Sequence, residues 1–314
     1  MCVTSADPRL HAPASARARD IVRGAYDLHV HVNPDVITRR IDDLDLAERF
    51  GELGLRGFVL KSHYVPTAER ARVVRKAVPG VDALGAIVLN QAVGGLNTIA
   101  VEIAAREGAR FVWLPTFDAE NEPAGRVAPQ PGAHLPAWAE MQHELRRQGV
   151  ASEPVPVVDT EGNVLPETRA VLRAVARHGL VLATGHLGRD EIFAVVDAAR
   201  EEGVEHIVVT HPEFPTQRIS PRDQAALAER GALLERCFTT AHTGKVAWEE
   251  MYANIRAAGI ERSFLSTDLG QLSNPPIEDG LALMADRMLA AGFSSDEIHR
   301  MAVVNTRLLA KGER

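Results

Sequence analysis

Cysteine is scarce in this chain of 314 residues, and long apolar runs are missing from it. The two cysteines, Cys2 and Cys237, exclude a disulfide framework and favour a reducing compartment, so we expect a cytoplasmic protein. No apolar run approaches the roughly 18 residues of a membrane span, which predicts no contact with a membrane. The first residues lack the apolar segment of a secretory signal, and we interpret residues 1–24 as a polar N-terminal arm.

A surplus of positive charge is also missing, because the formal net charge is −7 at pH 7. Nucleic acids and anionic membrane surfaces bind basic faces, so the charge predicts neither as a partner. The partner that we expect is a small-molecule substrate.

What the chain does have is a regular alternation of short β-rich runs with amphipathic segments. Several of the amphipathic segments begin at Asp, Thr, Ser or Pro and end at Gly, as helices do. The runs with the composition of strands are residues 26–30, 57–61, 83–89, 110–114, 180–184, 206–210, 232–237 and 263–266. Eight such βα units predict an α/β fold of the (β/α)8 TIM-barrel type, formed as a single domain by residues 25–314.

One interval breaks this spacing, because about 65 residues separate the fourth run from the fifth. It holds a Pro/Gly-rich loop and a short hairpin that turns at Glu161–Gly162. A loop after a barrel strand lies on the C-terminal face, so we expect residues 117–165 to be an insertion that forms a lid. A disordered segment or a loop without function are the alternatives.

Polar side chains follow the strands at their C-terminal ends. His29 and His31, in "HVH", project to one side because a strand alternates its side chains. His186 follows the fifth strand, His211 the sixth and Asp268 the eighth. The C-terminal ends of barrel strands converge, so these five side chains should meet. Imidazoles with one carboxylate suit zinc, iron(II) or manganese.

Further polar residues occur at the same strand ends. Lys61 and His63 follow the second strand in "KSH", and Glu213 follows the sixth in "VVTHPEF". We interpret these three as substrate-binding groups or as ligands of a second metal. The seventh strand holds Glu235 and Cys237, and we interpret Cys237 as a small core residue.

The ordered set of "HVH", His186, His211 and Asp268 resembles the amidohydrolase superfamily of metal-dependent hydrolases over almost the whole chain. The stretches "GFVLKSHYVPT", "ATGHL", "VVTHPEF" and "LSTDLGQ" are most similar to a bacterial branch without an established substrate. The resemblance implies that His29, His31 and His186 bind a divalent metal, zinc before manganese or iron. It implies that His211 binds a second metal or donates a hydrogen bond to the substrate. Asp268 would bind the metal and take a proton from its water.

The chain departs from that family at the fourth strand. Many two-metal members carry a carboxylated lysine or a glutamate there, whereas this strand ends in "VWLPTFDA". Lys61 could supply a carboxylated bridge from the second strand, or it could be a cation that holds a substrate carboxylate or polarises a carbonyl. We favour the cation, and therefore one metal ion over two.

These inferences predict a hydrolase that uses metal-activated water to cleave a C–N or C–O bond in a small amide, lactam, lactone or ester. Asp268, Lys61 and His211 are its expected catalytic residues. A phosphoesterase of the histidinol-phosphatase-like type, a decarboxylase or a deaminase are the enzymatic alternatives. A barrel that binds a metal or ligand without turnover is the alternative from another class. A homodimer is the expected assembly.

Overall fold

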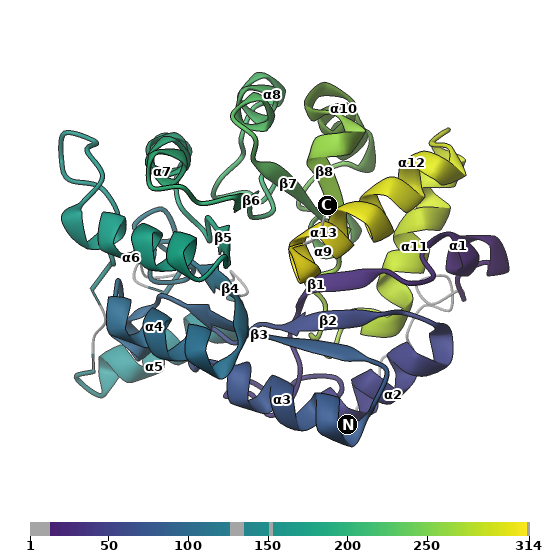
Figure 1. The fold of residues 1–314 in the computed structure, drawn as a ribbon, viewed down its shortest axis with the longest axis horizontal. Helices are drawn as coiled ribbons and strands as arrows, with labels where there is room; N and C mark the ends of the chain where they lie inside the picture. Colours follow the sequence, from purple (N-terminus) through teal and green to yellow (C-terminus); the bar gives the residue numbers. More distant parts are fainter. Residues whose placement is uncertain (1–12, 126–134, 151–152, 313–314) are drawn as a thin grey trace.

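The computed structural model describes residues 13–125, 135–150 and 153–312. Within them, one parallel sheet follows chain order from β1 to β8 and curls into a ring (Figure 1). The strands are β1 (Tyr26–Val30), β2 (Gly57–Leu60), β3 (Asp82–Val88), β4 (Ala109–Trp113), β5 (Val181–Ala183), β6 (His206–Val209), β7 (Leu233–Cys237) and β8 (Ser263–Ser266). Each strand begins within one residue of its predicted start, and the predicted (β/α)8 barrel is confirmed.

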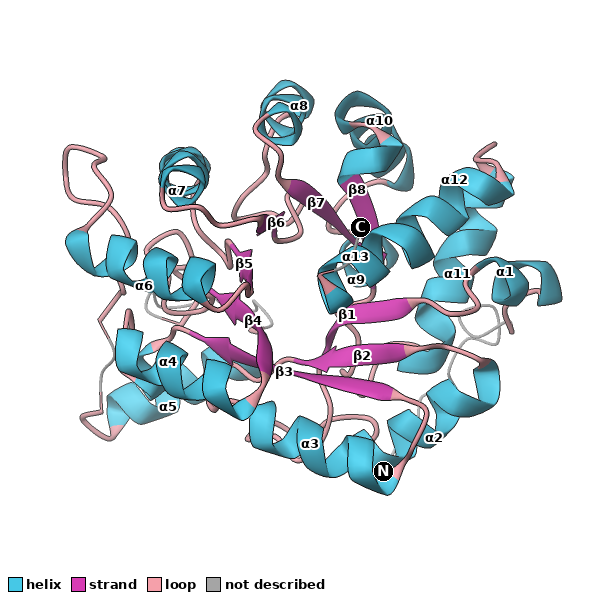
Figure 2. Cartoon of the chain, viewed as in Figure 1, coloured by secondary structure: helices cyan, strands magenta, loops and turns pink. Residues whose placement is uncertain are grey.

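Most of the helices surround the strands on the outside of the ring, as Figure 2 shows, while Leu309 and Ala310 of the last helix pack with the residues inside it. The helices are α1 (Ala16–Ile21), α2 (Asp43–Leu53), α3 (Ala68–Ala77), α4 (Thr98–Glu107), α5 (Ala137–Arg147), α6 (Pro166–Arg177), α7 (Arg189–Glu201), α8 (Pro221–Glu229), α9 (Phe238–His242), α10 (Trp248–Ala258), α11 (Ile277–Ala290), α12 (Ser295–His299) and α13 (Asn305–Lys311). Their ends follow local chemistry: the Asp42 side chain accepts from the backbone of Asp45 to start α2, and Gly54 ends it in the left-handed conformation. In the described part of the chain, no helix is long and apolar enough to cross a membrane.

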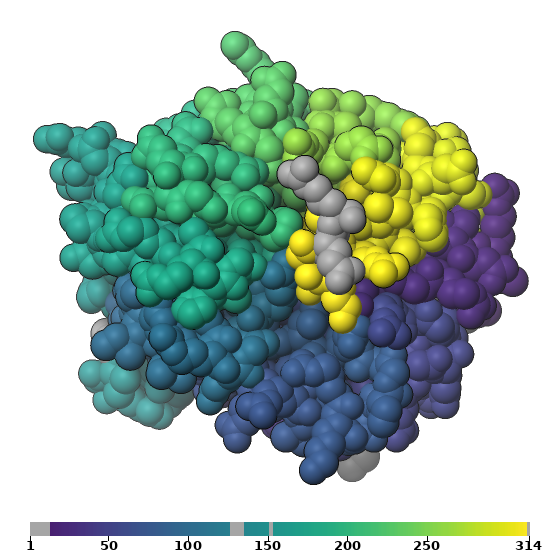
Figure 3. Space-filling view, in the orientation of Figure 1, coloured from purple at the N-terminus to yellow at the C-terminus, as the bar shows by residue number. Residues whose placement is uncertain are grey.

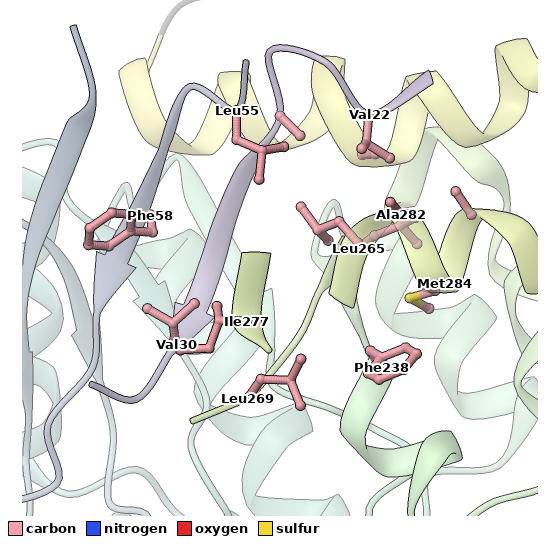
Figure 4. Packing of buried hydrophobic residues seen from close by; sticks show 14 of the residues in the cluster. Val22, Val30, Leu55, Phe58, Phe238, Leu265, Leu269, Ile277, Ala282 and Met284 are labelled. Carbon is pink, nitrogen blue, oxygen red and sulfur yellow. The ribbon is translucent and has the colours of Figure 1, made fainter. Parts of the chain in front are cut away.

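The core lies on both sides of the strands, which explains why the strands are almost wholly apolar. Between β1, β2, β8 and the helices, Val30, Phe58, Leu265, Ile277 and Met284 pack together (Figure 4). Each is at most 1% exposed, and burying one such side chain contributes about 1.5–3 kcal/mol. A separate cluster fills the inside of the barrel; it includes Tyr26, Leu28, Val59, Phe111, Trp113 and Phe264.

The barrel closes between β1 and the residues that follow β8. The Asp268 amide donates to the carbonyl of His29 at 2.8 Å, and the His31 amide donates to the carbonyl of Leu269 at 2.9 Å. The Asp27 carboxylate accepts from the Thr267 amide at 3.0 Å and from its hydroxyl at 2.6 Å. This seam joins the two ends of the chain and places Asp268 between the two histidines.

The N-terminal segment lies beside the C-terminal helices on one face of the molecule (Figure 3). Helix α1 contacts α11 and α12, and it buries Ala18 and Ile21. The Ser15 hydroxyl donates to Asp286 at 2.6 Å. The described end of the expected polar arm therefore packs on the barrel wall, while Cys2 and the rest of residues 1–12 lie outside the described residues.

The expected insertion follows β4, and its described parts are α5 and the predicted hairpin. Val158 pairs with Val164 in an antiparallel bridge, and Gly162 between them has a φ of 85°. Residues 126–134 and 151–152 of the expected lid lie outside the described residues. The start of α5, at Ala137 and Trp138, lines the pocket described below.

Candidate metal centre

His29, His31 and Asp268 form the centre of the candidate site. The Nε2 atoms of the two histidines lie 3.1 Å and 3.2 Å from the same atom, Oδ1 of Asp268. All three side chains are buried at the end of β1 and just after β8, and their potential ligand atoms lie within 4.8 Å of one another. The "HVH" spacing therefore places both imidazoles on one side, as predicted.

Backbone and side-chain acceptors fix the orientation of both imidazoles. The Nδ1 atom of His29 lies 2.9 Å from Oε1 of Glu235, and that of His31 lies 3.1 Å from the carbonyl oxygen of Lys61. A carboxylate or a carbonyl oxygen accepts, so Nδ1 donates in each case and Nε2 keeps a lone pair. Partners of this kind orient the histidines of metal sites.

Two lone pairs and a carboxylate oxygen thus face one another, and such an arrangement requires a positive charge among them. Burial and Lys61 disfavour a charged His29, but Asp268 and Glu235 outweigh them and raise its pKa to about 9. Burial also disfavours the charge of Asp268, yet His29 and His31 hold the pKa of this carboxyl well below its usual range. The donor set therefore fits a divalent cation.

Lys61 enters the same cluster from the end of β2. Its Nζ lies 2.9 Å from Nε2 of His29 and 5.2 Å from the ring centroid of Trp113. The side chain is 3% exposed, and burial lowers the pKa of its amine. Lys61 thus reaches the atom of His29 that would bind a metal.

Three further histidines extend the cluster across the barrel. Ring centroids lie 5.0 Å apart for His31 and His63, 6.4 Å for His63 and His186, and 5.0 Å for His186 and His211. The ring centroids of His211 and His29 lie 6.0 Å apart, so the last histidine of this series is again next to the first. The structure therefore brings together every predicted histidine of the site.

The surroundings of His211 fix its ring. Its Nδ1 lies 3.1 Å from Oε1 of Gln217, whose amide nitrogen donates to the carbonyl of Gly185 at 2.7 Å. Since that second bond orients the Gln217 amide, Nδ1 of His211 donates and its Nε2 carries the lone pair. The Nε2 atom of His211 is therefore the ring atom that could bind a metal ion.

His186 has the least satisfied ring of the group. Its Nδ1 is buried and forms no hydrogen bond with any residue that the structure describes, although Oε2 of Glu122 lies 3.3 Å away. Glu122 is 3% exposed and comes from the segment after β4. An unsatisfied buried imidazole nitrogen is costly, which is consistent with a ligand that completes the site.

Burial keeps most of these imidazoles neutral. Desolvation, with a contribution from Arg39, lowers the pKa of His31 to about 3. Desolvation also holds the pKa of His63 and of His211 well below the usual range, and it lowers that of His186. Neutral imidazole is the form that binds a metal.

The backbone at the site is unusual. Asp268 has a φ of 53° and His211 a φ of 24°, two of the positive values among the non-glycine residues described. Gly270 has a φ of 139°, and a Cβ atom there would lie 1.8 Å from the carbonyl oxygen of His31. Strained backbone of this kind persists where the surrounding structure holds a functional group in place.

The cluster opens into a cavity of about 530 Å³ at the C-terminal ends of the strands. His31, Lys61, His63, His186 and Asp268 line its base. A larger cavity of about 990 Å³ lies around the starts of β6 and β7 and contains none of the predicted site residues. In a barrel of this fold the active site lies at the C-terminal face, which favours the smaller cavity.

Two predicted site residues, His29 and Glu213, do not line the cavity. His29 still belongs to the cluster through its Nε2 atom, whereas Glu213 lies apart from it. Its carboxylate pairs with the buried guanidinium of Arg236 and accepts from the side-chain amide of Asn254 at 3.2 Å. Glu213 follows β6 in the sequence, as the site residues follow their strands. Its side chain nevertheless points to the interior between β7 and the helices.

Sequence reasoning assigned no role to Glu122 or Arg39, and none to Glu235 beyond its place on the seventh strand. Alternation along β7 puts Glu235 and Cys237 on one face, which was an available signal for a second buried polar group. Burial raises the pKa of the Cys237 thiol well above its usual value, consistent with the core residue expected. Glu122 and Arg39 lie in loops without periodicity, where no comparable signal exists.

Comparison with known proteins places this site in a wider group. Residues 24–235 match a family described as "Family of unknown function (DUF6282)", and no curated protein matches the chain. An amidohydrolase from Pseudomonas aeruginosa is 11% identical, with 94% of this chain and 99% of that chain covered and a TM-score of 0.58. A putative 2-pyrone-4,6-dicarboxylic acid hydrolase from Pseudomonas putida is 17% identical, with coverage of 93% and 99% and a TM-score of 0.57.

A 2,6-dihydroxybenzoate decarboxylase shares the same architecture at 12% identity, with coverage of 92% and 99% and a TM-score of 0.51. Identities this low compare the fold alone. The chain thus shares its fold with these enzymes, among them an amidohydrolase.

Proposed function

We propose that this chain, which belongs to the family of unknown function DUF6282, is a metal-dependent hydrolase acting on a small organic molecule. The convergence of two Nε2 atoms on one oxygen of Asp268, at the base of a cavity, carries the proposal. The names of the similar structures, hydrolases and one decarboxylase, support the general class.

His29, His31 and Asp268 would hold the metal, with His186 and His211 adjacent to it. Zinc is the proposed ion, and one ion is favoured over two. A divalent ion bound there polarises a substrate carbonyl and makes water more acidic. His31 is neutral and Asp268 is ionised, as a metal site requires, whereas His29, with a pKa of about 9, would give up its proton on binding the ion.

Asp268 is the proposed general base and acid. Its ionised carboxylate takes a proton from the attacking water, whose oxygen forms the new bond to the carbonyl carbon. As the C–N or C–O bond breaks, Asp268 returns the proton to the leaving nitrogen or oxygen. The positive φ of Asp268 and its backbone bond to His29 hold this carboxylate in the cluster.

Lys61 and His211 complete the proposed catalytic group in different ways. Lys61 is a donor that reaches the cluster and stabilises negative charge on the substrate oxygen. The bond between Nδ1 of His211 and Gln217 supports a ligand role for His211 over a donor role toward the substrate. His63, which contacts Thr116 at 2.8 Å, lines the substrate side of the cavity.

Metal content measured by elemental analysis tests the binding part of this proposal. Protein purified without chelator or added metal should contain about one equivalent of zinc, manganese or iron. The His29→Ala/His31→Ala variant should contain none. A metal-free wild-type protein with the stability of the variant would overturn the proposal.

Hydrolysis of a panel of lactones, esters and amides tests the chemical part. Asp268→Asn should retain much of its metal and lose at least about a hundredfold in turnover, as expected for a removed acid–base group. Asp190→Asn is the matched control, since Asp190 is exposed at the start of α7 and does not line the cavity. Unchanged turnover in Asp268→Asn would contradict the mechanism.

The role of Lys61 can be decided by counting ions. If Lys61 is a cation, Lys61→Met keeps one equivalent of metal and loses activity. A carboxylated Lys61 would instead give two equivalents in the wild type, a dependence on bicarbonate, and loss of one ion in the variant.

A further inference from the structure

The cavity contains a buried arginine that the proposed mechanism does not use. Arg39 lies in the loop after β1, is 7% exposed, and lines the cavity together with His31 and Asp268. Arginine is among the residue types that are least often buried unless they are paired, so the partners of each edge of its guanidinium decide what Arg39 can bind.

The loop holds Arg39 in a fixed position. The Asn33 side chain accepts from the Arg39 amide at 3.1 Å and donates to its carbonyl oxygen at 3.0 Å. The Arg39 Nε donates to Oδ2 of Asp35 at 2.7 Å, and the Asp35 side chain is 2% exposed. Three bonds thus fix the backbone and one edge of the guanidinium before any ligand arrives.

The opposite edge of this guanidinium is unused. Among the described residues, neither terminal nitrogen of Arg39 has a hydrogen-bond partner, and both belong to a side chain on the cavity wall. Two parallel N–H donors on a planar group match the two oxygens of a carboxylate.

A second cation lines the same cavity. Lys245 is exposed, its Nζ lies 4.4 Å from the ring centroid of Phe214, and no ion pair joins it to any residue within the described ranges. Arg39, Lys61 and Lys245 are therefore the cationic residues of the wall and Asp268 is its carboxylate, while Asp35 pairs with Nε of Arg39 without lining the cavity. A cationic cavity in a chain with a net charge of −7 is a local feature that favours an anionic ligand.

The remaining walls are apolar. Phe214, Trp138, Ile37 and Leu272 contribute to the cavity, and its volume of about 530 Å³ suits a small molecule. Aromatic and aliphatic side chains would cover the body of a ligand whose charged end is held elsewhere.

We propose that the substrate is a small organic carboxylate whose carboxylate group pairs with the two terminal nitrogens of Arg39. Lys245 adds positive charge at the rim, and Phe214 and Trp138 contact the apolar body. The group to be hydrolysed then lies toward Asp268. This inference rests on the proposed function for the reaction, but the binding step needs Arg39 and no metal.

Binding of matched acids and amides tests the inference. The probes are benzoate with benzamide and succinate with succinamide, measured by calorimetry on the protein as purified and after removal of metal by a chelator. We expect the acids to bind about tenfold or more tightly than the amides in both states. Equal binding of acids and amides, or no binding of either acid, would overturn the proposal.

Variants of Arg39 and Lys245 test which residue causes the preference for acids over amides. Arg39→Gln should abolish the preference for acids, and Arg39→Lys should restore part of it because the charge returns without the two-pronged geometry. Lys245→Gln, at an exposed position that disturbs no buried partner, should reduce acid binding by a smaller factor. Arg49→Gln is the matched control, since Arg49 is exposed on α2 and pairs only with Glu52. Full acid preference in both Arg39→Gln and Lys245→Gln contradicts the proposal.

Two further measurements separate this inference from the proposed function. Arg39→Gln should keep the metal content of the wild type, so lost acid binding with retained metal points to Arg39 itself. A metal-free wild-type protein that still prefers acids would overturn the hydrolase and leave the carboxylate site standing. Phenyl phosphate serves as the competing anion, and tighter binding of it than of benzoate would reject a carboxylate as the ligand.

Discussion

Oε1 of Glu235 accepts a hydrogen bond from Nδ1 of His29 at 2.9 Å, from the side opposite to Asp268. The Ser266 hydroxyl donates to the same oxygen at 2.9 Å, and the other oxygen accepts from the His211 amide at 3.1 Å. One carboxylate on β7 therefore orients a side chain of β1 and the backbone after β6. Glu235 does not line the cavity, and its contact with Nδ1 of His29, the ring atom away from Asp268, makes it a positioning residue.

Replacing this carboxylate should weaken the metal site without unfolding the barrel. Glu235→Gln keeps the size of the side chain but lowers the basicity that it gives to His29, so we expect metal affinity to fall about 10- to 100-fold. Competition with a coloured chelator measures this affinity, and circular dichroism checks the fold. Wild-type affinity in the variant would show that Glu235 does not act through His29.

Asp27 should make stability depend on pH. Burial raises the pKa of its carboxyl from 3.8 to about 7, against the bonds from Thr267. Between these two pH values, the Asp27 carboxyl is protonated in the folded chain and ionised in the unfolded chain. The stability contributed by Asp27 is present below about pH 3.8 and is lost as the pH rises through 7, on the order of 4 kcal/mol in total.

Asp27→Asn removes this titration and should flatten that part of the stability profile. Chemical unfolding at several pH values between 4 and 8 provides the free energies. The wild type and the variant should differ in slope, and parallel profiles would show that Asp27 does not change its charge in this range.

Glu213 should matter for stability and leave the metal unaffected. Replacing Glu213 leaves the guanidinium of Arg236, which is 0% exposed, without its carboxylate partner. Breaking such a buried pair costs about 3–5 kcal/mol. Glu213→Gln should therefore lower the free energy of unfolding by about that amount and retain the wild-type metal content. Glu229→Gln, at an exposed position on α8, should change neither quantity. Loss of metal in soluble, folded Glu213→Gln would restore the role first inferred from the sequence.

Gly270 should tolerate no side chain. An added Cβ would meet the carbonyl oxygen of His31 and displace the backbone of this proposed metal ligand, so Gly270→Ala should lose metal affinity as well as stability. Gly80→Ala is the control, because Gly80 also has a positive φ, of 100°, and nothing lies within 4 Å of its added Cβ. That control should show only the conformational cost, about 1–2 kcal/mol, and full metal binding. Equal metal loss in both variants would argue against the close contact as the cause.

The sequence predicted the strands and the histidine cluster well for one physical reason. Strands buried on both sides are short apolar runs, and the residue at the end of each run must lie at the rim of the barrel. His29, His31 and Asp268 follow directly from that rule. Their mutual distances could be anticipated because parallel strands leave little freedom at their ends.

The same rule failed to place Glu213 and to find Arg39. Glu213 lies two residues beyond His211, where the backbone has already turned through a positive φ, so alternation along β6 no longer describes its direction. Arg39 is fixed by side-chain bonds to Asn33 and Asp35 within one loop. Such contacts depend on the path of the backbone, which composition and periodicity do not specify.

The seam between β1 and the end of β8 determines when the site can exist during synthesis. Asp27 and Thr267 are separated by 240 positions in the chain, and His29 and Asp268 are almost equally far apart. A nascent chain that stops short of Asp268 therefore holds the two imidazoles without their carboxylate. The proposed cation, if all three side chains hold it, would bind only after residue 268 has been synthesised.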